Sequence, residues 1–227
     1  GDFPRCKLDD PKLNECMDKA ITLALSTYLS NGIPSLQLLP VDPLDIEHVD
    51  IQHGGDRPVG VKLSVNKAKL HGLKNTVTSN TKFDTEKRVI NCIVAVKQLR
   101  LEGDYVLDGK ILQLPLKGKG KCQLLVGPYK SRVVMGFETK TKKGEVYWNL
   151  NKFTIDMYDV ENFHVNFENL FNGDKALGEA TNKALNENWQ GLFQELKQPL
   201  EETFSEVFRR VGNTVFSKVP ENDLFSK

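Results

Sequence analysis

One stretch of this 227-residue chain gathers several side chains that could bind a metal ion. It reads D-I-E-H-V-D from Asp45 to Asp50 and is followed by His53 and a glycine pair. Zinc sites on helices place their ligands at fixed short spacings, such as four residues apart, on one face. This stretch does not follow that spacing, and the two remaining histidines lie far away in the sequence. We therefore expect no metal site and no cofactor.

Local motifs for catalysis are missing as well. The sequence contains no nucleophile elbow, no phosphate-binding loop, no dinucleotide-binding fingerprint and no zinc-protease motif. Aspartate and glutamate pairs are frequent, but on amphipathic surfaces such pairs are usually solvated. Many catalytic sites have no local signature, so a hydrolase acting on lipophilic esters stays open as an alternative. The prediction is a binding protein rather than an enzyme.

The four cysteines bear on the compartment. Cys6 and Cys16 flank a Pro/Asp-rich turn before the first predicted helix, and their spacing permits either a small disulfide-closed loop or two separate thiols. A disulfide closing a loop of that size stabilises by roughly 2–3 kcal/mol. Cys92 and Cys122 lie in predicted strands, where buried free thiols and a bridge both stay open. A disulfide at the first pair would favour an extracellular protein.

Composition and charge exclude several classes of function. Hydrophobic residues make up 39% and charged residues 27% of the chain, an ordinary globular balance with a sizeable core. The formal net charge is +1, and nucleic-acid binding needs a concentrated positive surface, so no nucleic-acid partner is expected. No apolar run is long enough for a transmembrane segment. Two lysine groups on predicted strands or in a turn indicate a solvated face with weak attraction to membranes: Lys117, Lys119 and Lys121, and Lys140, Lys142 and Lys143.

The chain ends in a predicted helix of unusual length, from residue 175 to about residue 218. Asp174 can cap its first turn, and Pro199 is the one proline inside it. Apolar residues recur along the whole run with the 3.6-residue period of a straight helix. At about 1.5 Å per residue this helix would be roughly 60 Å long, and we interpret Pro199 as a local bend rather than an end. Such a helix needs an equally long partner to cover its apolar face.

The middle of the chain supplies that cover as a long antiparallel sheet. A first, shorter helix runs from Asp10-Pro11 to Asn31-Gly32, and no linker divides the sheet from either helix. The order helix–sheet–helix predicts one α+β domain over residues 1–227, in which a strongly curved antiparallel sheet wraps a long C-terminal helix and a short helix precedes them. The expected strands alternate apolar and polar residues and are separated by short turns: 59–70, 89–107, 110–116, 121–126, 132–139, 145–157 and 160–167.

One segment carries a specific family resemblance. Residues 169–178 read N-L-F-N-G-D-K-A-L-G and are followed by Asn182, Leu185 and an Asn-Glu-Asn-Trp run that ends at Trp189. Together with this segment, the whole chain resembles the insect Takeout proteins, which are relatives of the juvenile-hormone-binding proteins. Further matching positions are the Cys6 and Cys16 pair, Gly32-Ile33-Pro34, Asp42-Pro43-Leu44, Gly72-Leu73-Lys74 and the glycine turns between residues 103 and 120.

The resemblance implies a secreted, non-enzymatic carrier of small lipophilic molecules. It also implies the fold of the tubular lipid-binding superfamily, with a hydrophobic tunnel between helix and sheet, and a disulfide between Cys6 and Cys16. The second disulfide of the juvenile-hormone-binding proteins is missing, because no cysteine follows Cys122. The chain is therefore more similar to Takeout, and juvenile hormone is not implied as its ligand. A receptor of unknown identity stays open as a further partner.

Large apolar side chains that face the predicted interior are candidates for the tunnel wall, with ordinary core packing as the alternative for each. The expected ligand is an elongated terpenoid, fatty-acid derivative or isoprenoid chain. The rival is an apolar groove that binds a protein partner. Tyrosine hydroxyls or the Trp189 N–H could orient a polar ligand end. The candidates are Leu25, Tyr28, Leu29, Leu99, Leu101, Tyr105, Met135, Phe137, Phe153, Met157, Phe167, Leu185, Trp189 and Phe193.

Overall fold

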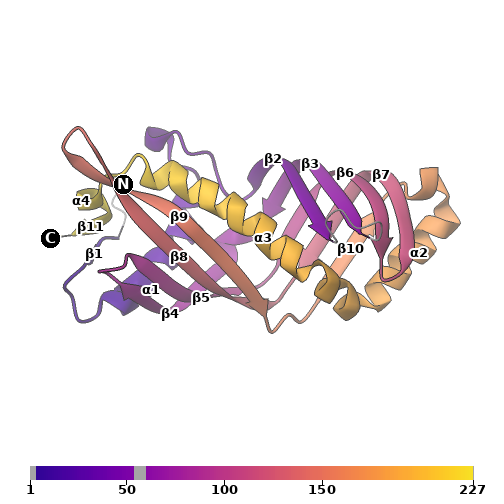
Figure 1. Cartoon of the computed structure of the whole chain (residues 1–227), viewed down its shortest axis with the longest axis horizontal. Coiled ribbons are helices and arrows are strands. Elements are labelled where there is room, and N and C mark those ends of the chain that lie inside the picture. Colours follow the sequence, from indigo (N-terminus) through magenta and orange to yellow (C-terminus); the bar gives the residue numbers. More distant parts are fainter. Residues whose placement is uncertain (1–3, 54–59, 227) are drawn as a thin grey trace.

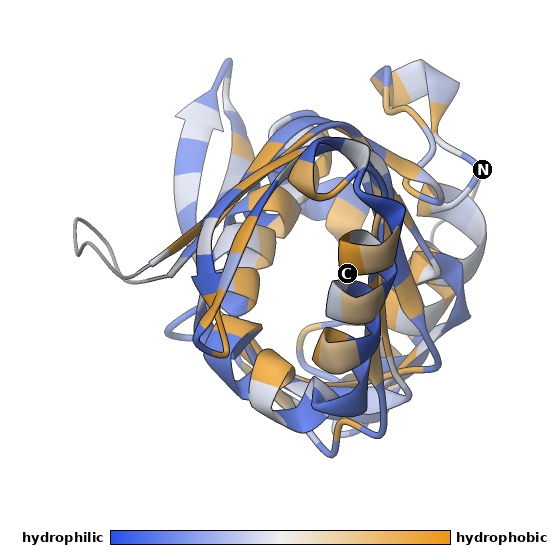
Figure 2. Cartoon of the chain, turned by 90° about the vertical axis from the view of Figure 1, so that its right-hand side faces the viewer, coloured by the Kyte–Doolittle hydropathy of each residue, from blue (hydrophilic) through white to orange (hydrophobic). Residues whose placement is uncertain are grey.

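Helix α3 (Trp189–Phe216) runs diagonally along the elongated molecule, and two β-sheets lie against it (Figure 1). The structure is a computed structural model that describes residues 4–53 and 60–226. It confirms the α+β class with a long C-terminal helix packed on antiparallel sheets and a short N-terminal helix. Viewed end-on, strands and helices close into a ring around the core (Figure 2). The His53 side chain and the Gly54-Gly55 turn lie outside the described residues.

The strands of the described residues form two antiparallel sheets and one small parallel pair. The five-stranded sheet has the order β10-β7-β6-β3-β2 and contains β2 (Leu44–His53), β3 (Val61–His71), β6 (Leu99–Ile111), β7 (Leu114–Val126) and β10 (Phe163–Phe167). The four-stranded sheet has the order β4-β5-β8-β9 and contains β4 (Thr76–Asp84), β5 (Val89–Val96), β8 (Tyr129–Lys142) and β9 (Glu145–Tyr158). The parallel pair joins β1 (Cys6–Lys7) to β11 (Phe225–Ser226).

Helices lie at both ends of the sequence. The longer ones besides α3 are α1 (Leu13–Leu23), which continues into a π-helical turn (Ala24–Leu29), and α2 (Lys175–Glu187). The short ones are α4 (Glu221–Leu224) and the 3₁₀ turns η2 (Pro34–Leu36), η3 (Leu73–Asn75) and η4 (Phe171–Gly173).

The predicted single sheet is divided into two sheets. We call the region between them, where the connecting segments pass from one sheet to the other, the waist. The chain crosses from one sheet to the other four times, at residues 72–75, 97–98, 127–128 and 159–162. The predicted strand 89–107 is therefore interrupted at residues 97–98, where it passes the waist. The long run of strands was recognised correctly, but its interruption was not.

Two glycines allow the crossings to stack closely at the waist. Gly72 (φ +107°) and Gly127 (φ +126°) adopt backbone conformations that other residues avoid. A Cβ at Gly72 would lie 2.1 Å from the carbonyl oxygen of Gln98, and one at Gly127 would lie 2.6 Å from that of Lys97. The Asp42 carboxylate accepts a hydrogen bond from the Gly72 amide at 3.1 Å and holds the first crossing in place.

Several predicted strands have wrong bounds, two of them by crossing a turn or a change of sheet, and β2 and β4 were not predicted as strands. The predicted run 89–107 forms β5 and β6, which belong to different sheets. The predicted run 110–116 contains the β6–β7 turn at Leu112-Gln113, where both φ angles are positive. The expected turn at Gly109 instead lies inside β6, where a Cβ would be 2.0 Å from the carbonyl oxygen of Gly60. Gly109 therefore allows two segments of the chain to approach closely, and it does not form the turn between two strands.

The prediction of one continuous helix over residues 175–218 is also wrong. Asn188 (φ −111°, ψ 41°) separates α2 from α3, and the two helices run in different directions (Figure 1). The Asn188 side chain folds over Gly191, where a Cβ would lie 3.0 Å from its Oδ1. Helix α3 does continue through Pro199, and its 28 residues correspond to about 42 Å. Asp174 caps α2 as predicted, because its carboxylate accepts from the amide three residues later at 3.0 Å.

Helix α2 covers an exposed sheet edge with two asparagine amides. Asn186 accepts from the Val165 amide at 2.8 Å and donates to the Val165 carbonyl at 2.7 Å. Asn182 makes the same pair of bonds with Phe167, both at 2.9 Å. Because β10 is an edge strand, these backbone groups have no neighbouring strand to bind. The two side chains thus take the place of a missing strand.

Side chains of α3 and α1 also form hydrogen bonds with the backbone of edge strands. On α3, Asn213 accepts from the Leu150 amide at 2.8 Å and donates to the Leu150 carbonyl at 2.9 Å, at the edge strand β9. On α1, three side chains spaced four residues apart accept from amides of the edge strand β4: Asn14 from Phe83, Asp18 from Thr81 and Thr22 from Thr78. Side-chain pairing of this kind fixes the helices on the sheets.

A second, smaller core closes the end of the molecule that holds both chain termini. It contains Phe137, Trp148 and Phe225, with ring centroids 4.9 and 5.1 Å from the tryptophan. The disulfide between Cys6 and Cys16 is confirmed and attaches α1 to this core. The other two cysteines, Cys92 and Cys122, are buried free thiols, and burial raises the pKa of each to about 12.

Candidate ligand-binding site

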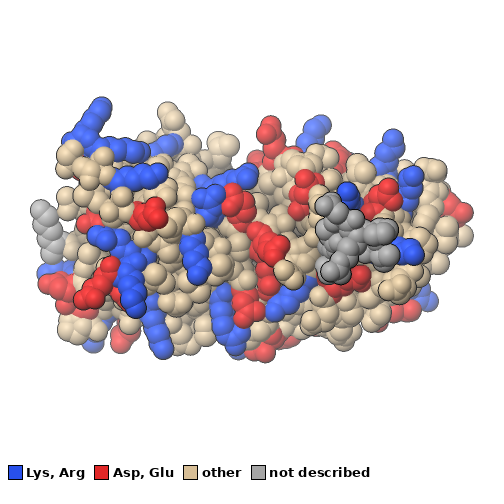
Figure 3. Space-filling model, viewed as in Figure 1, with Lys and Arg blue, Asp and Glu red and all other residues tan. Residues whose placement is uncertain are grey.

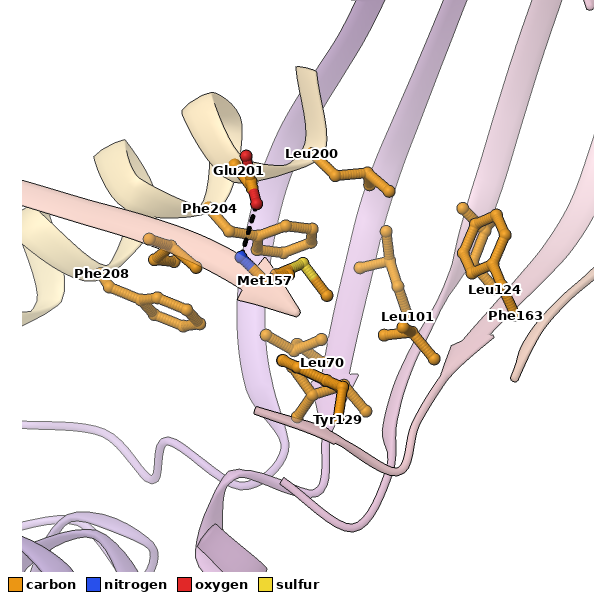
Figure 4. Close-up of a pocket in the computed structure, with 13 residues that line it drawn as sticks. Leu70, Leu101, Leu124, Tyr129, Met157, Phe163, Leu200, Glu201, Phe204 and Phe208 are labelled. Carbon is orange, nitrogen blue, oxygen red and sulfur yellow. Dashed lines mark hydrogen bonds between the residues drawn. The ribbon is translucent and has the colours of Figure 1, made fainter. Parts of the chain in front are cut away.

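An apolar cavity of about 50 Å³ lies at the waist, between α3 and both sheets (Figure 4). It is enclosed by the strand ends that flank the crossings and by one face of the helix. Its lining residues are apolar or aromatic except for Glu201. They are Leu70, Leu99, Leu101, Leu124, Val126, Tyr129, Ile155, Met157, Phe163, Leu200, Glu201, Phe204 and Phe208.

The periods of strand and helix bring these side chains together. Leu99 and Leu101 are two residues apart on β6, directly after the second crossing, so both face the interior. Leu200, Phe204 and Phe208 are four residues apart on α3 and present one stripe to the same space. A cavity forms at the waist because the two sheets separate there, while α3 continues across the gap between them.

Glu201 supplies the charged group of the cavity. One of its carboxylate oxygens, Oε1, accepts from the Met157 amide at 2.6 Å (Figure 4) and lies 3.6 Å from Nζ of Lys197. Lys197 itself binds Asp156 at 3.0 Å, and Asp156 also binds Arg132 at 2.9 Å, so the charges in this group balance. Burial penalises the ionised form of Glu201 and raises its pKa, although the Met157 amide and Lys197 oppose that shift.

We expect Glu201→Gln to increase the free energy of unfolding, and to do so more at neutral than at acid pH. Because the pKa is raised in the folded state, this carboxyl favours folding below its unfolded pKa of about 4.3, and that contribution is lost as the pH rises through the folded value. Glutamine keeps an oxygen for the Met157 amide and removes the charge. Urea unfolding measured against pH tests this, with Glu202→Gln at an exposed position as the charge-matched control. A gain that is equal at every pH would contradict the expectation.

Tyr129 supplies the second polar group of the lining. Its side chain is 7% exposed, and no described residue forms a hydrogen bond with its hydroxyl. Burial alone raises its pKa, so the phenol is neutral at physiological pH. Buried tyrosine hydroxyls usually have a partner. Tyr129 is thus the lining residue with a neutral polar group.

Packing along the interior differs between the two halves of the helical region. At the α2 end, Trp189 is half-buried, and four apolar side chains that face the large core are 0–3% exposed: Leu185, Leu192, Phe193 and Leu196. At the cavity and beyond it, apolar side chains of α3 that contact the same core are half-buried: Phe204, Val207, Phe208 and Val211. The apolar face of α3 is therefore mostly buried on the α2 side of the cavity and partly exposed from Phe204 onward.

The structure brings some of the predicted wall residues to the cavity and distributes the others through the two cores. Those that line the cavity are Leu99, Leu101 and Met157. Those that contact the large core away from it are Leu29, Tyr105, Phe167, Leu185, Trp189 and Phe193. Those in the smaller core are Met135, Phe137 and Phe153. Leu25 and Tyr28 are half-buried on the π-helical turn.

Tyr105 has a structural partner for its hydroxyl. The side chain is 1% exposed, and the hydroxyl donates to the carbonyl oxygen of Glu168 at 2.6 Å. Gly118 leaves room for it, because a Cβ at that position would lie 2.7 Å from the hydroxyl. The polar end of Tyr105 thus holds the segment before α2 and does not face the cavity.

Ten cavity residues were not among the predicted wall residues. The helical stripe of Leu200, Phe204 and Phe208 was visible in the sequence as a continuation beyond Pro199, and choosing it would have found three of them. Tyr129 follows the Gly127-Pro128 crossing, and its place at the cavity depends on that crossing. Positions next to a waist cannot be chosen before the waist itself is known.

Two kinds of feature are absent from the described part of the chain. No three histidine, cysteine, aspartate or glutamate side chains within residues 4–53 and 60–226 converge as possible metal ligands. None of the helices found there is long and apolar enough to cross a membrane.

A long helix packed on antiparallel sheets, with an apolar cavity between them, defines the class of sheet-wrapped proteins that bind hydrophobic ligands. The family model described as haemolymph juvenile hormone binding protein matches residues 1–226. The chain therefore belongs to the haemolymph juvenile hormone binding protein family, which also includes Takeout. Its members are non-enzymatic binding proteins for hydrophobic ligands, and haemolymph is an extracellular fluid.

Individual relatives agree with this assignment. The chain is 26% identical over 230 residues to the circadian clock-controlled protein daywake of Drosophila melanogaster. The alignment covers 98% of this chain and 86% of that protein. The corresponding protein of Drosophila yakuba is 26% identical over 228 residues, with 97% and 86% covered. The crystal structure of Epiphyas postvittana Takeout 1 superposes with a TM-score of 0.84 at 26% identity, and covers 99% of this chain and 100% of that one.

Proposed function

We propose that this protein is a secreted, single-domain carrier that holds an elongated apolar molecule in an internal tunnel. The tunnel would start at the waist cavity and follow the C-terminal half of α3. The observation that carries the proposal is the change in burial along that helix, from side chains 0–3% exposed at Leu192 and Phe193 to half-buried phenylalanines at 204 and 208. Partly exposed phenylalanines that line an apolar cavity can be covered by an apolar ligand.

The cavity must expand to accept such a ligand. Its volume of about 50 Å³ is smaller than the roughly 150 Å³ that holds benzene in an engineered protein cavity. The side chains that would move are Met157, which is unbranched and adaptable, and the half-buried Phe204 and Phe208. Affinity would come mainly from apolar area removed from water, at about 25 cal/mol per Å² before ordering costs.

The lining favours a ligand that is hydrocarbon over most of its length. A single polar group on the ligand would bind the Tyr129 hydroxyl, which has no partner among the described residues. A ligand carboxylate near the other polar group would meet the Glu201 carboxylate, so a neutral oxygen such as a hydroxyl, ester or ketone fits better. Terpenoids, isoprenoid chains and esterified fatty acids have this composition.

Organic extraction of the purified protein followed by mass spectrometry tests the proposal. We expect one lipophilic compound in a molar amount close to that of the protein, or its uptake when the empty protein is incubated with such compounds. An interior that binds no apolar molecule would overturn the carrier and favour a groove for a protein partner. Turnover of lipophilic esters would favour the hydrolase alternative instead.

A further inference from the structure

A surface hollow of about 510 Å³ lies at the end of the molecule where α3 terminates. It separates the tip of the β8–β9 hairpin from the 3₁₀ turn η2 and the residues that follow α3. Figure 1 shows these three segments at the upper left, far from α2. The lining residues are Ser35, Leu36, Gln37, Lys142, Lys143, Glu145, Tyr147, Ser217 and Lys218.

The hollow presents lysines that the protein does not neutralise. Within the described residues, no carboxylate lies within 4.0 Å of the ammonium groups of Lys142, Lys143 or Lys218. The carboxylate in the hollow, Glu145, accepts from the Tyr147 hydroxyl at 3.0 Å. Lysine and arginine side chains project from this end of the space-filling surface (Figure 3). The hollow therefore combines excess positive charge with hydroxyl donors, which is the chemistry that binds phosphate groups.

An exposed leucine lies close to this hollow in the sequence. Leu39 is 73% exposed, more than any other large hydrophobic residue that the structure describes. It lies three residues after the η2 turn, and Lys218 donates to the Leu36 carbonyl within that turn. The lysines and the η2 turn thus form one surface, the basic tip, made of residues 35–37, 142–147 and 217–218, and Leu39 follows it two residues later in the chain.

We propose that the basic tip docks the protein on an anionic phospholipid membrane. Lipid phosphates would occupy the hollow and bind the lysine ammonium groups, while Leu39 inserts below the headgroups. An acidic protein partner would use the lysines equally well, but it would give no role to the exposed leucine two residues after the tip. An anionic lipid surface offers phosphate groups for the lysines and, below them, hydrocarbon for the leucine.

The position of the basic tip relates docking to the cargo. The half-buried apolar stripe of α3 runs toward Phe216, and Ser217 and Lys218 of the tip follow immediately. A docked molecule would hold the C-terminal end of α3, and the smaller core that packs on Phe216, next to the bilayer. This link rests on the proposed carrier function, whereas docking itself does not.

Co-sedimentation with lipid vesicles tests the proposal on the full chain. We expect binding to phosphatidylcholine vesicles that contain phosphatidylserine, none to pure phosphatidylcholine, and loss of binding at high salt. Lys142→Gln with Lys143→Gln should weaken binding about 30-fold, since each lysine near an anionic surface contributes about 1 kcal/mol. Leu39→Ser should weaken binding at low salt as well, because it removes the apolar side chain and leaves every lysine in place.

The matched control is Lys117→Gln with Lys119→Gln, which removes the same charge from exposed positions on β7. We expect this pair to keep binding within about two-fold of the unmodified protein. Equal losses in both double variants would show attraction by net charge alone and overturn the basic tip. Equal binding to neutral vesicles, or binding of inorganic phosphate without any vesicle binding, would overturn membrane docking. Ligand extraction from the same preparations reports separately on the carrier function.

Discussion

Asn186→Ala should lower the free energy of unfolding by about 2–4 kcal/mol, a large effect for one polar residue on a helix that faces water. The side chain satisfies both backbone groups of Val165, which is 0% exposed on the edge strand β10. Alanine would leave a buried N–H and a buried C=O without partners, and each such loss costs about 1–3 kcal/mol. Nothing else among the described residues can replace the amide, because β10 has a strand on one side only.

The pairing works because helix and strand periods nearly coincide. Asn182 and Asn186 are one turn apart, about 6 Å along the helix, and Phe167 and Val165 are two residues apart, about 6.8 Å along the strand. Asn182→Ala should therefore destabilise similarly, through Phe167. Urea unfolding is the measurement, and Glu179→Ala at an exposed position of the same helix is the control, expected within about ±0.5 kcal/mol. Equal effects at all three positions would mean that only helix propensity was measured.

This asparagine pair also shows how far the sequence could predict the fold. The segment around Asn182 and Asn186 carried the family resemblance, and with the apolar periods it indicated the α+β class correctly. The hydrogen bonds to Val165 and Phe167 were not predictable, because asparagines on a helix surface look the same whether they face water or a strand edge. The break at Asn188 was missed for a related reason. The apolar period continues through it, and only the two different edges that α2 and α3 cover require a change of direction.

The site was less predictable than the fold because the cavity forms where the run of strands is interrupted between the two sheets. Alternation correctly identified Leu99 and Leu101 as inward-facing, but inward-facing residues of a packed core have the same pattern. What distinguishes cavity from core is the separation of the strands at the waist. That separation depends on Gly72 and Gly127, whose roles come from contacts with chain segments far away in the sequence. The apolar period of a sequence predicts which face of a strand or helix is buried. It does not predict whether two buried faces touch or leave a cavity between them.

Leu101→Trp should weaken binding of apolar ligands by on the order of 100-fold while the protein stays folded. Leu101 is 3% exposed and lines the waist cavity, so the indole would occupy the space of about 50 Å³ from which the proposed tunnel begins. A blocked entrance that leaves about 100 Å² of ligand surface unburied loses about 2.5 kcal/mol of affinity. Titration with an apolar naphthylamine dye, and with the extracted ligand, gives the dissociation constants.

Val106→Trp is the matched control, because it introduces the same side chain on the same strand at a position that is 51% exposed. It should bind the dye as the unmodified protein does. Overpacking at Leu101 costs about 1–3 kcal/mol, so thermal unfolding must show a folded variant, and Leu101→Phe offers a smaller increase in volume if it does not. Unchanged affinity in a folded Leu101→Trp protein would separate the ligand from the waist. The half-buried stripe at Val207 and Val211 would then have to bind it alone, and the change in burial along α3 would mark the site without the cavity.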